Sequence, residues 1–598
     1  MPVRSIAELS DRDVLRRLGE TLRLSTTYAY LRLDPFALDS EHWSLRSLQV
    51  RHAISNLESL QGVMGFRDQE EGLIVPDIDR CVRSIWPTLV LWIDFLHPVH
   101  HVGTERMERV PLQALCDILN ELFRTDTPAF QLCKETPRLY ELLFLLWLRL
   151  DEYVTPGTDV YHCLSYLAHT VDRSMYVVPK RSFMTEIAKA QPFSDRVQAV
   201  AGYYKAPHCI PAALAAVGHR PHKLYRKMLV QARLLADAIA TLRSDKLLEK
   251  ISEPFIPISE FVTLQLVMHR YPKDIVCGFV DLIHYLRDMP GGRGNGPARM
   301  LCSILSSIWA TCDDGRSLAW SLRAGVLPIM IALDAKKSDD ILVAHALHIV
   351  TRKAYHVRVL REFLKGGEAL SFVGATFKGP NTLASYDNEI RRRVNLLQRW
   401  SQEKCLYTKC HSNIDAVPVA VRRCPCFSAA YCSKECQRAD WASHKPNCVN
   451  GVHTVEIGTH DILSLYPGDL SPQDAHFIAF YVRTWTHTHA QTLLQSVIRA
   501  QEITPSGSKP HKYNVQVNVG ELPVGYDFWI LELPRDRQDD SWLTFSATVT
   551  RPQGMALVQV MVLPLTALRA RAGKSVAEGY PVQGYALEHE FHPMRATE

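Results

Sequence analysis

Eight cysteine and histidine side chains form four closely spaced pairs within residues 405–448. The pairs have the spacings C-x4-C, C-x-C, C-x3-C and H-x3-C. Zinc prefers thiolate and imidazole ligands in tetrahedral geometry, and a short spacing lets one turn of backbone supply two of them. Eight ligands therefore predict two closed, structural zinc sites with no open position for a catalytic water. The predicted ligands are Cys405, Cys410, Cys424, Cys426, Cys432, Cys436, His444 and Cys448.

Two other interpretations of this segment are a chance cluster of buried thiols and a disulfide framework. Seven of the fifteen cysteines lie in it, and it holds no long apolar run that would bury them, which argues against chance. The remaining cysteines are scattered singly, mostly among apolar residues, as reduced core thiols are. A cytosolic or nuclear compartment keeps thiols reduced, so a disulfide framework is disfavoured.

The second half of the segment resembles the MYND-type zinc finger. The residues that carry the resemblance are Tyr431-Cys432-Ser433-Lys434-Glu435-Cys436-Gln437, Asp440-Trp441, His444-Lys445 and Cys448. The first half departs from that family, which usually spaces its first two pairs as C-x2-C. Here the first pair is C-x4-C, and the second, Cys424-Pro425-Cys426, is one residue shorter than usual, which leaves it less freedom to chelate. His411 is an alternative ligand near the first pair, ranked below Cys410 because a thiolate holds zinc more strongly.

The resemblance implies more than the spacing does. MYND fingers interleave their ligands, so Cys405, Cys410, Cys432 and Cys436 would hold one zinc and Cys424, Cys426, His444 and Cys448 the other. Similar fingers bind short proline-containing peptides of partner proteins, often transcriptional or chromatin regulators. The resemblance places Gln437 and Trp441 in the peptide groove, and a rigid aromatic ring suits a pre-extended proline peptide. The alternative role of Trp441 is to cover the metal sites.

Motifs of common enzymes are missing from the sequence, which has neither a G-x-S-x-G elbow nor an H-E-x-x-H helix. The sequence His589-Glu590-Phe591-His592 is one residue short of the latter spacing. The histidines at 97, 100 and 101 cluster at a predicted helix end and need no ligand there. Glycine-rich residues 291–297 lack the Gly-Lys-Ser/Thr of a phosphate loop and predict a loop before a helix. We therefore expect a protein that is not an enzyme.

Two rival functions remain to be weighed. MYND fingers also occur in SET-type protein lysine methyltransferases, so a divergent enzyme of that class is the alternative function. Such enzymes are β-rich and carry a further cysteine-containing zinc segment, whereas no cysteine follows Cys448 here. Direct nucleic-acid binding is disfavoured, because the finger is only mildly basic and lacks a long recognition helix for the major groove.

Apolar residues recur at helical spacing through most of the first 400 residues. The predicted fold class is mainly α, with an armadillo-like α-solenoid, a small two-zinc finger and a C-terminal α+β domain. Residues 152–210 are expected to be loopier, and Pro87 is expected to break or kink a helix that begins at Asp77. The other predicted helices cover residues 43–63, helices starting at Pro111 and Pro137, and residues 224–242, 261–269, 275–286, 298–310 and 341–350.

Residues 317–330 resemble one armadillo-type repeat, in which a helix ends at Ala324-Gly325 and the next begins at Leu327-Pro328. Glycine suits the end of a helix and proline its first turn. No clean repeat period extends through the rest, so an irregular helical domain is the alternative.

The predicted domains are a helical domain at 1–365, a linker and helix at 366–403, the MYND-type finger at 404–450, an α+β domain at 451–565 and a polar tail at 566–598. The α+β domain is expected to have one long helix from Ser471-Pro472 to Ile503 and an antiparallel sheet. Its predicted strands are residues 513–517, 526–533, 544–550 and 555–563. The triplet Arg391–Arg393 is assigned to a solvated helix face, with a weak nuclear-import or phosphate patch as the alternative.

Charge and hydropathy restrict the compartment and partners. A formal net charge of +5 is small for 598 residues and makes no case for nucleic-acid binding. Early charged residues such as Arg4 and Glu8 argue against a secretory signal. The most apolar run, residues 139–150, contains Glu141 and Arg149 and is too short to span a bilayer. We expect an intracellular protein of the nucleus or cytoplasm with no membrane partner.

Overall fold

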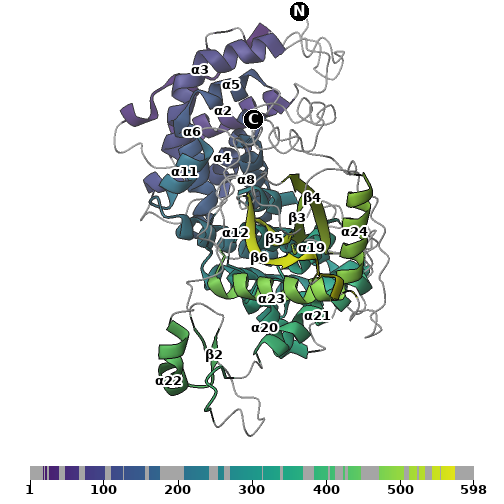
Figure 1. The fold of residues 1–598 in the computed structure, drawn as a ribbon. Helices are drawn as coiled ribbons and strands as arrows, with labels where there is room; N and C mark the ends of the chain where they lie inside the picture. Colours follow the sequence, from purple (N-terminus) through teal and green to yellow (C-terminus); the bar gives the residue numbers. More distant parts are fainter. Residues whose placement is uncertain are drawn as a thin grey trace, which may run out of the picture. The chain divides into compact units, whose positions relative to one another are not determined.

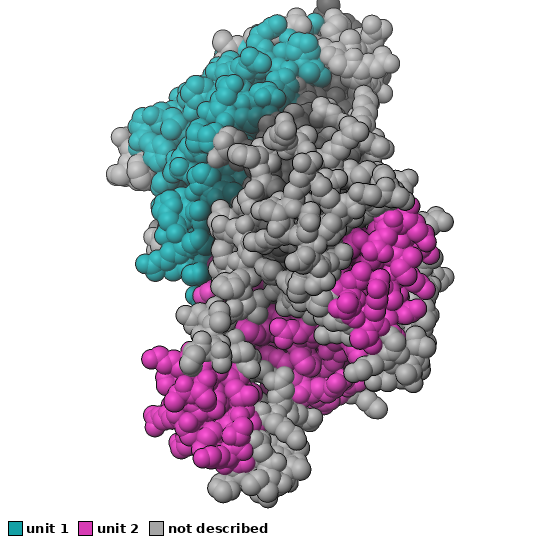
Figure 2. Space-filling view, in the orientation of Figure 1, with its two compact units in different colours: residues 1–267, 281–304 teal, residues 268–280, 305–598 magenta. Residues whose placement is uncertain are grey.

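The computed structural model describes two compact units, which Figure 2 shows in different colours. Unit 1 contains residues 1–267 and 281–304, and unit 2 contains residues 268–280 and 305–598. The described residues are 18, 20–22, 24, 26–38, 47–65, 75–101, 109–124, 127–154, 160–175, 208–241, 253–261, 268, 270–312, 314–336, 341–367, 383–401, 405–410, 422–424, 429–445, 470–503, 511–520, 524–532, 542–551, 554–566, 568–570 and 572.

The described residues of unit 1 are mostly helical (Figure 1). Its α-helices are α2 (Leu48–Gly65), α3 (Val75–Leu96), α4 (Arg109–Leu122), α5 (Pro128–Lys134), α6 (Pro137–Leu148), α7 (Leu150–Tyr153), α8 (Val160–Ser174), α11 (Cys209–Ala216), α12 (Pro221–Thr241) and α14 (Ile256–Glu260). Short 3-10 helices are η2 (Ala29–Arg32), η3 (Pro35–Ala37), η6 (Pro98–His101), η7 (Glu253–Phe255) and η9 (Pro290–Gly292). The division between units passes through α15 (Lys273–Arg287) and α16 (Asn295–Thr311).

Helix α6 contacts α8, α11 and α12. Eight of its twelve residues are buried, as its apolar pattern predicts for a helix enclosed by others. Pro137 takes the first helical position, where its missing N–H costs no hydrogen bond. Thr136 precedes it but does not cap the helix with its side chain. Its hydroxyl instead donates to the Leu132 carbonyl at 2.8 Å and accepts from the Trp86 indole N–H at 3.1 Å.

Two predictions for unit 1 are wrong in part. Pro87 does not break its helix, because α3 continues through it to Leu96. The neighbouring side chains Ile85 and Leu89 are both buried, so packing on each side holds the helix together across the lost hydrogen bond. Residues 160–174, within the stretch 152–210 that is expected to be loopier, form the regular helix α8. The predicted helix at 261–269 lies mostly outside the described residues.

The helices of unit 2 include the predicted repeat-like pair. The helices that lie wholly in unit 2 are α17 (Arg316–Arg323), α18 (Val326–Lys336), α19 (Ile341–Arg352), α20 (Val357–Gly366), α21 (Leu383–Ser401), α22 (Lys434–His444), α23 (Pro472–Thr488) and α24 (Ala490–Ile503). Helix α17 ends at Ala324-Gly325, and α18 begins at once, with Pro328 in its first turn, as predicted. Gly325 has φ 84°, a left-handed value that only glycine adopts without strain. The mainly α fold class is confirmed.

No described helix is by itself long and apolar enough to cross a membrane. The pair α17–α18 passes the test of length and composition only when joined, and it is bent by 76°.

Four strands form the sheet of unit 2, in the order β4-β3-β5-β6. They are β3 (His511–Asn518), β4 (Gly525–Glu532), β5 (Trp542–Arg551) and β6 (Gly554–Pro564). The prediction of an antiparallel sheet is wrong for the central pair, because β3 and β5 are parallel. Strand β4 pairs antiparallel with one edge of β3, and β5 pairs with the other edge in the same direction as β3. Helix α23 contacts β5 and β6 (Figure 1).

Three further features differ from the sequence-based expectation. The predicted helix 471–503 is two helices, with His489 between α23 and α24. Arg393 is not on a solvated helix face, because it is buried and pairs with Glu389 at 2.9 Å. Leu568 and Ala572, within the predicted polar tail, are also buried. The local sequence pattern does not predict that Arg393, Leu568 and Ala572 are buried, because tertiary packing decides their burial.

Candidate metal centre

Four cysteines from distant parts of the segment 405–436 lie together. The sulfur atoms of Cys405, Cys410, Cys432 and Cys436 are all within 4.8 Å of one another. The Cys410–Cys432, Cys432–Cys436 and Cys410–Cys436 sulfur distances are 3.3, 3.5 and 3.7 Å. Zinc–sulfur bonds of about 2.3 Å at tetrahedral angles place sulfur atoms about 3.8 Å apart. The cluster therefore has the size of a four-thiolate zinc site.

Short elements of backbone bring these ligands together. A two-stranded antiparallel ladder, β1 (Arg422–Arg423) with β2 (Ala430–Tyr431), leads directly into Cys432. The Leu406 N–H donates to the Ala430 carbonyl at 2.7 Å, which holds the first pair beside β2. Ser433 then caps α22, accepting from the Cys436 N–H at 3.2 Å. The cap fixes the first turn of α22, so Cys436 faces the other sulfurs.

A second pair of predicted ligands meets at the other end of α22. The Nε2 atom of His444 lies 3.3 Å from the sulfur of Cys424, and both side chains are buried. Tetrahedral bonds from one zinc would place a nitrogen and a sulfur about 3.5 Å apart. The other two predicted ligands of this site, Cys426 and Cys448, lie outside the described residues, as does His411.

The chemistry of the four-cysteine cluster fits a bound cation. Burial and the neighbouring thiols raise the pKa of Cys436 to about 12, and burial also raises the pKa of Cys405. Four thiolates cannot share so small a space without a positive charge among them, and a metal ion supplies it. Every cysteine that the structure describes has a free thiol, so no disulfide competes for these sulfurs within the described chain. Zinc bound here would stabilise the fold of the segment and would have a structural, not a catalytic, role.

Residues of the motif that do not bind metal have structural roles. The Tyr431 hydroxyl donates to Asp440 at 2.8 Å and so ties β2 to the middle of α22. Tyr431 is fully buried, with its ring against that of His444. A lone Tyr-x8-Asp spacing carries no signal in the sequence, so this contact is visible only in the structure.

The two predicted peptide-binding residues lie on one side of α22. Gln437 and Trp441 are four residues apart, a spacing that places side chains on the same helical face. Gln437 is half-buried, and Trp441 is 42% exposed. The indole ring lies 6.0 Å from the His444 ring, measured between centroids. Trp441 therefore borders the second metal site while leaving much of its ring open to solvent.

The histidines near residue 100 serve the packing of unit 1. His97 is buried, its Nε2 lies 3.2 Å from the Leu142 carbonyl, and burial lowers its pKa to about 3. His100 pairs with Asp94 at 2.8 Å, and His101 contacts the Phe95 carbonyl. Each ring has its own partner, as expected of histidines that need no metal. The sequence His589–His592 lies outside the described residues.

Comparison with known proteins supports the assignment of the segment. Residues 405–448 match the model of the MYND finger family, the same window that holds the eight predicted ligands. A search of curated proteins finds no significant match. Among solved structures, a crystal structure of Kap121p matches with 11% identity and a TM-score of 0.22. That match covers 96% of this chain and 53% of the other, so the chain spans about half the length of Kap121p. Residues 405–448 of this chain are a MYND finger, a zinc-binding protein-interaction domain.

Proposed function

We propose that this protein is a non-enzymatic interaction scaffold whose MYND finger binds short proline-containing peptides of partner proteins, including regulators of transcription. The exposed ring of Trp441, on the same face of α22 as Gln437, is the observation that carries the proposal. A flat aromatic surface loses little conformational entropy on binding, and a proline-rich peptide is already extended. The proposed place of action is the cytoplasm or the nucleus.

The finger would hold two zinc ions. Cys405, Cys410, Cys432 and Cys436 supply the first site, and the contact between Cys424 and His444 forms half of the second. Cys426 and Cys448 complete the second site in this proposal. Native mass spectrometry of the purified chain should find two zinc ions, and one ion fewer after Cys424→Ser.

A peptide-binding assay tests the interaction itself. A fluorescent proline-containing peptide library is screened against the full chain, and the best binder is titrated against variants. Gln437→Ala and Trp441→Ala should each weaken binding about tenfold, because each removes part of one contact face. The matched control is Ala439→Ser, an exposed site about 200° around the same helix from Gln437. Unchanged binding in both variants, with zinc content intact, would overturn the proposal.

A further inference from the structure

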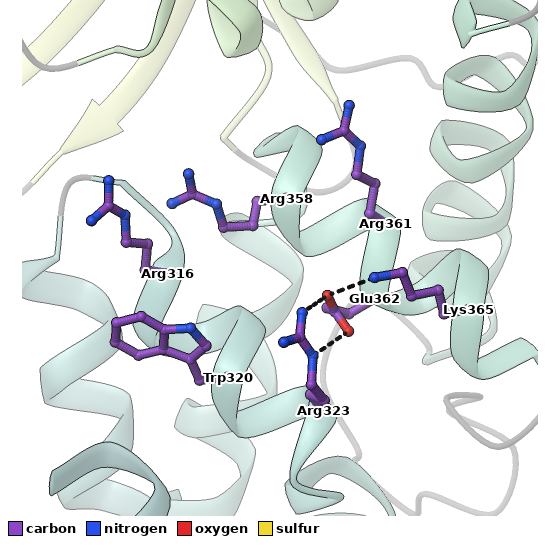
Figure 3. A pocket seen from close by; sticks show the side chains of 7 residues that line it. All are labelled: Arg316, Trp320, Arg323, Arg358, Arg361, Glu362 and Lys365. Carbon is purple, nitrogen blue, oxygen red and sulfur yellow. Dashed lines mark hydrogen bonds and ion pairs between the residues drawn. The ribbon is translucent and has the colours of Figure 1, made fainter. Parts of the chain in front are cut away.

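A second surface with binding character lies far from the finger in sequence. Helices α17 and α20 of unit 2 pack against each other and leave a hollow of about 380 Å³ between their exposed side chains. Figure 3 shows the seven residues that line it. They are Arg316, Trp320, Arg323, Arg358, Arg361, Glu362 and Lys365. Five of the seven are cationic.

The charges of this hollow are only partly balanced. Arg323 and Lys365 both contact Glu362, at 2.5 and 3.5 Å. Asp314, next to the hollow, pairs with Arg316 at 2.8 Å and lies 3.9 Å from Arg358. Among the described residues, five cations against two carboxylates leave three positive charges in excess. Within the described chain, Arg361 has no ion-pair partner.

Positive charge faces solvent, and negative charge is held beneath it. The side chain of Glu362 is 6% exposed, whereas those of Arg323 and Lys365 are 56% and 66% exposed. The hydrogen bond from Arg323 lowers the pKa of Glu362, so this carboxylate stays ionised and orients both cations. Figure 3 shows Arg316 and Arg358 side by side near the half-buried Trp320, with Arg361 farther along α20. An incoming anion meets the guanidinium groups first.

We propose that this hollow binds a phosphorylated, acidic segment of a partner protein. A phosphorylated side chain carries about −1.5 to −2 charges, so one such group with a flanking carboxylate matches the excess of three. Four of the five cations are arginines, whose planar forks bond two oxygens of a phosphate at once. The Trp320 ring supplies an apolar surface for the rest of the peptide.

The same features favour a peptide over a nucleic acid. Single-stranded nucleic acids are bound along a basic groove with several aromatic rings, one for each stacked base. Among the residues that the structure describes, Trp320 alone contributes an aromatic ring to the hollow, and the cations are gathered in one place. The net charge of the whole chain is also only +5. A local charge excess with a single ring fits one phosphorylated residue and its neighbours.

Fluorescence anisotropy with the full zinc-loaded chain tests the proposal. The probe is a labelled short peptide with a central phosphoserine flanked by glutamates, and its unphosphorylated form is the comparison. We expect the phosphorylated probe to bind at least about tenfold more tightly, because several charge-assisted contacts depend on the phosphate. Arg358→Gln and Arg361→Gln should each weaken binding about tenfold, and Arg399→Gln on α21, also exposed, should not.

Two further variants separate a binding role from a structural one. Glu362→Gln removes the internal anion with little change of shape, so it should tighten binding of the phosphorylated probe. The double variant Gln437→Ala/Trp441→Ala should leave this affinity unchanged, which separates the hollow from the finger. Equal binding of both peptides, or displacement of the probe by a single-stranded oligonucleotide at equal concentration, would overturn the proposal. So would insensitivity to both arginine variants.

Discussion

The buried arginine of α21 provides the sharpest test of how unit 2 is held together. Arg393 is 1% exposed, and its Nε donates to the Glu389 carboxylate at 2.9 Å. Its Nη2 donates to the Val519 carbonyl at 3.0 Å, and its guanidinium lies 5.1 Å from the centre of the Tyr481 ring. Tyr481 in turn donates to Glu389 at 2.6 Å. One side chain thus joins α21, α23 and the end of β3.

Replacing Arg393 with methionine keeps most of the side-chain volume and removes the charge. Removing one partner of a buried ion pair typically costs about 3 to 5 kcal/mol, since the other charge stays buried. Glu389 would keep the Tyr481 hydroxyl and Arg392, whose guanidinium lies 3.6 Å from it. We therefore expect the lower end, about 3 kcal/mol. The double variant Glu389→Gln/Arg393→Met should recover part of this loss, because no buried charge remains unpaired.

The loss of stability caused by Arg393→Met should depend on pH. Burial alone would raise the pKa of Glu389, but Arg393, Arg392 and Tyr481 lower it below its usual value. In the wild type, the stability that this carboxylate contributes is present above the unfolded pKa and is lost as pH falls through the lower folded pKa. Without Arg393 the pKa of Glu389 rises, so protonation relieves the variant at a higher pH. The difference in unfolding free energy between wild type and variant should therefore narrow as pH falls through the raised pKa of Glu389 in the variant.

Hydrogen exchange measured by mass spectrometry resolves this effect locally. Wild type and variants are compared at the same pH, so intrinsic exchange rates cancel. A loss of about 3 kcal/mol corresponds to protection reduced on the order of a hundredfold in peptides from α21 and β3. A single-variant loss below about 1 kcal/mol, or a double variant less stable than the single one, would refute the role given to this ion pair.

Three other perturbations have defined outcomes. Chelation of zinc should expose α22 to hydrogen exchange and leave α6 protected, because metal binding supplies most of the folding free energy of so small a finger. Gly294→Ala should lower the melting temperature and cost about 2 kcal/mol or more, since a Cβ there would lie 2.0 Å from the Leu286 carbonyl oxygen. Burial alone would raise the pKa of Asp474. Its pKa is nevertheless below the usual value, because the carboxylate lies 2.9 Å from His356 and accepts hydrogen bonds from the Val357 N–H and Ser471. Asp474→Asn should therefore reduce stability by about 2 kcal/mol at pH 7 in urea titrations, and by less as pH falls through the lowered pKa.

Where local pattern and packing agree, the sequence was enough to predict the structure. Residues 139–148 are apolar nearly all round, and eight of the twelve residues of α6 are buried. The Ala324-Gly325 stop and the α18 start follow from backbone geometry that only a few residue types favour. The finger was found from ligand spacing, because metal coordination fixes which residue types occur and how far apart they are.

Local sequence pattern does not predict the features of the structure that long-range packing decides. Pro87 breaks isolated helices, yet α3 runs through it between the buried Ile85 and Leu89. The pairing of β3 with β5 depends on which edge of β3 the returning chain reaches, and strand patterns alone do not determine that. The triplet Arg391–Arg393 looks like surface charge, but α23 presents Tyr481 to its last member.

The basic hollow could not be found in the sequence for the same reason. Arg316 and Arg361 are far apart along the chain, and each resembles an ordinary solvated charge on its own helix. Only the packing of α17 against α20 brings them to the same hollow.

Helix α22 links the metal chemistry of the finger to its proposed recognition face. Its first turn carries Cys436 into the four-cysteine cluster, and its last residue, His444, faces Cys424. Gln437 and Trp441 lie between these two positions. A helix of eleven residues is marginal alone in water, so its shape depends on what holds its ends. Metal bound at both ends would fix the helix and with it the angle at which Trp441 meets a peptide, which explains why a structural ion belongs in a binding module.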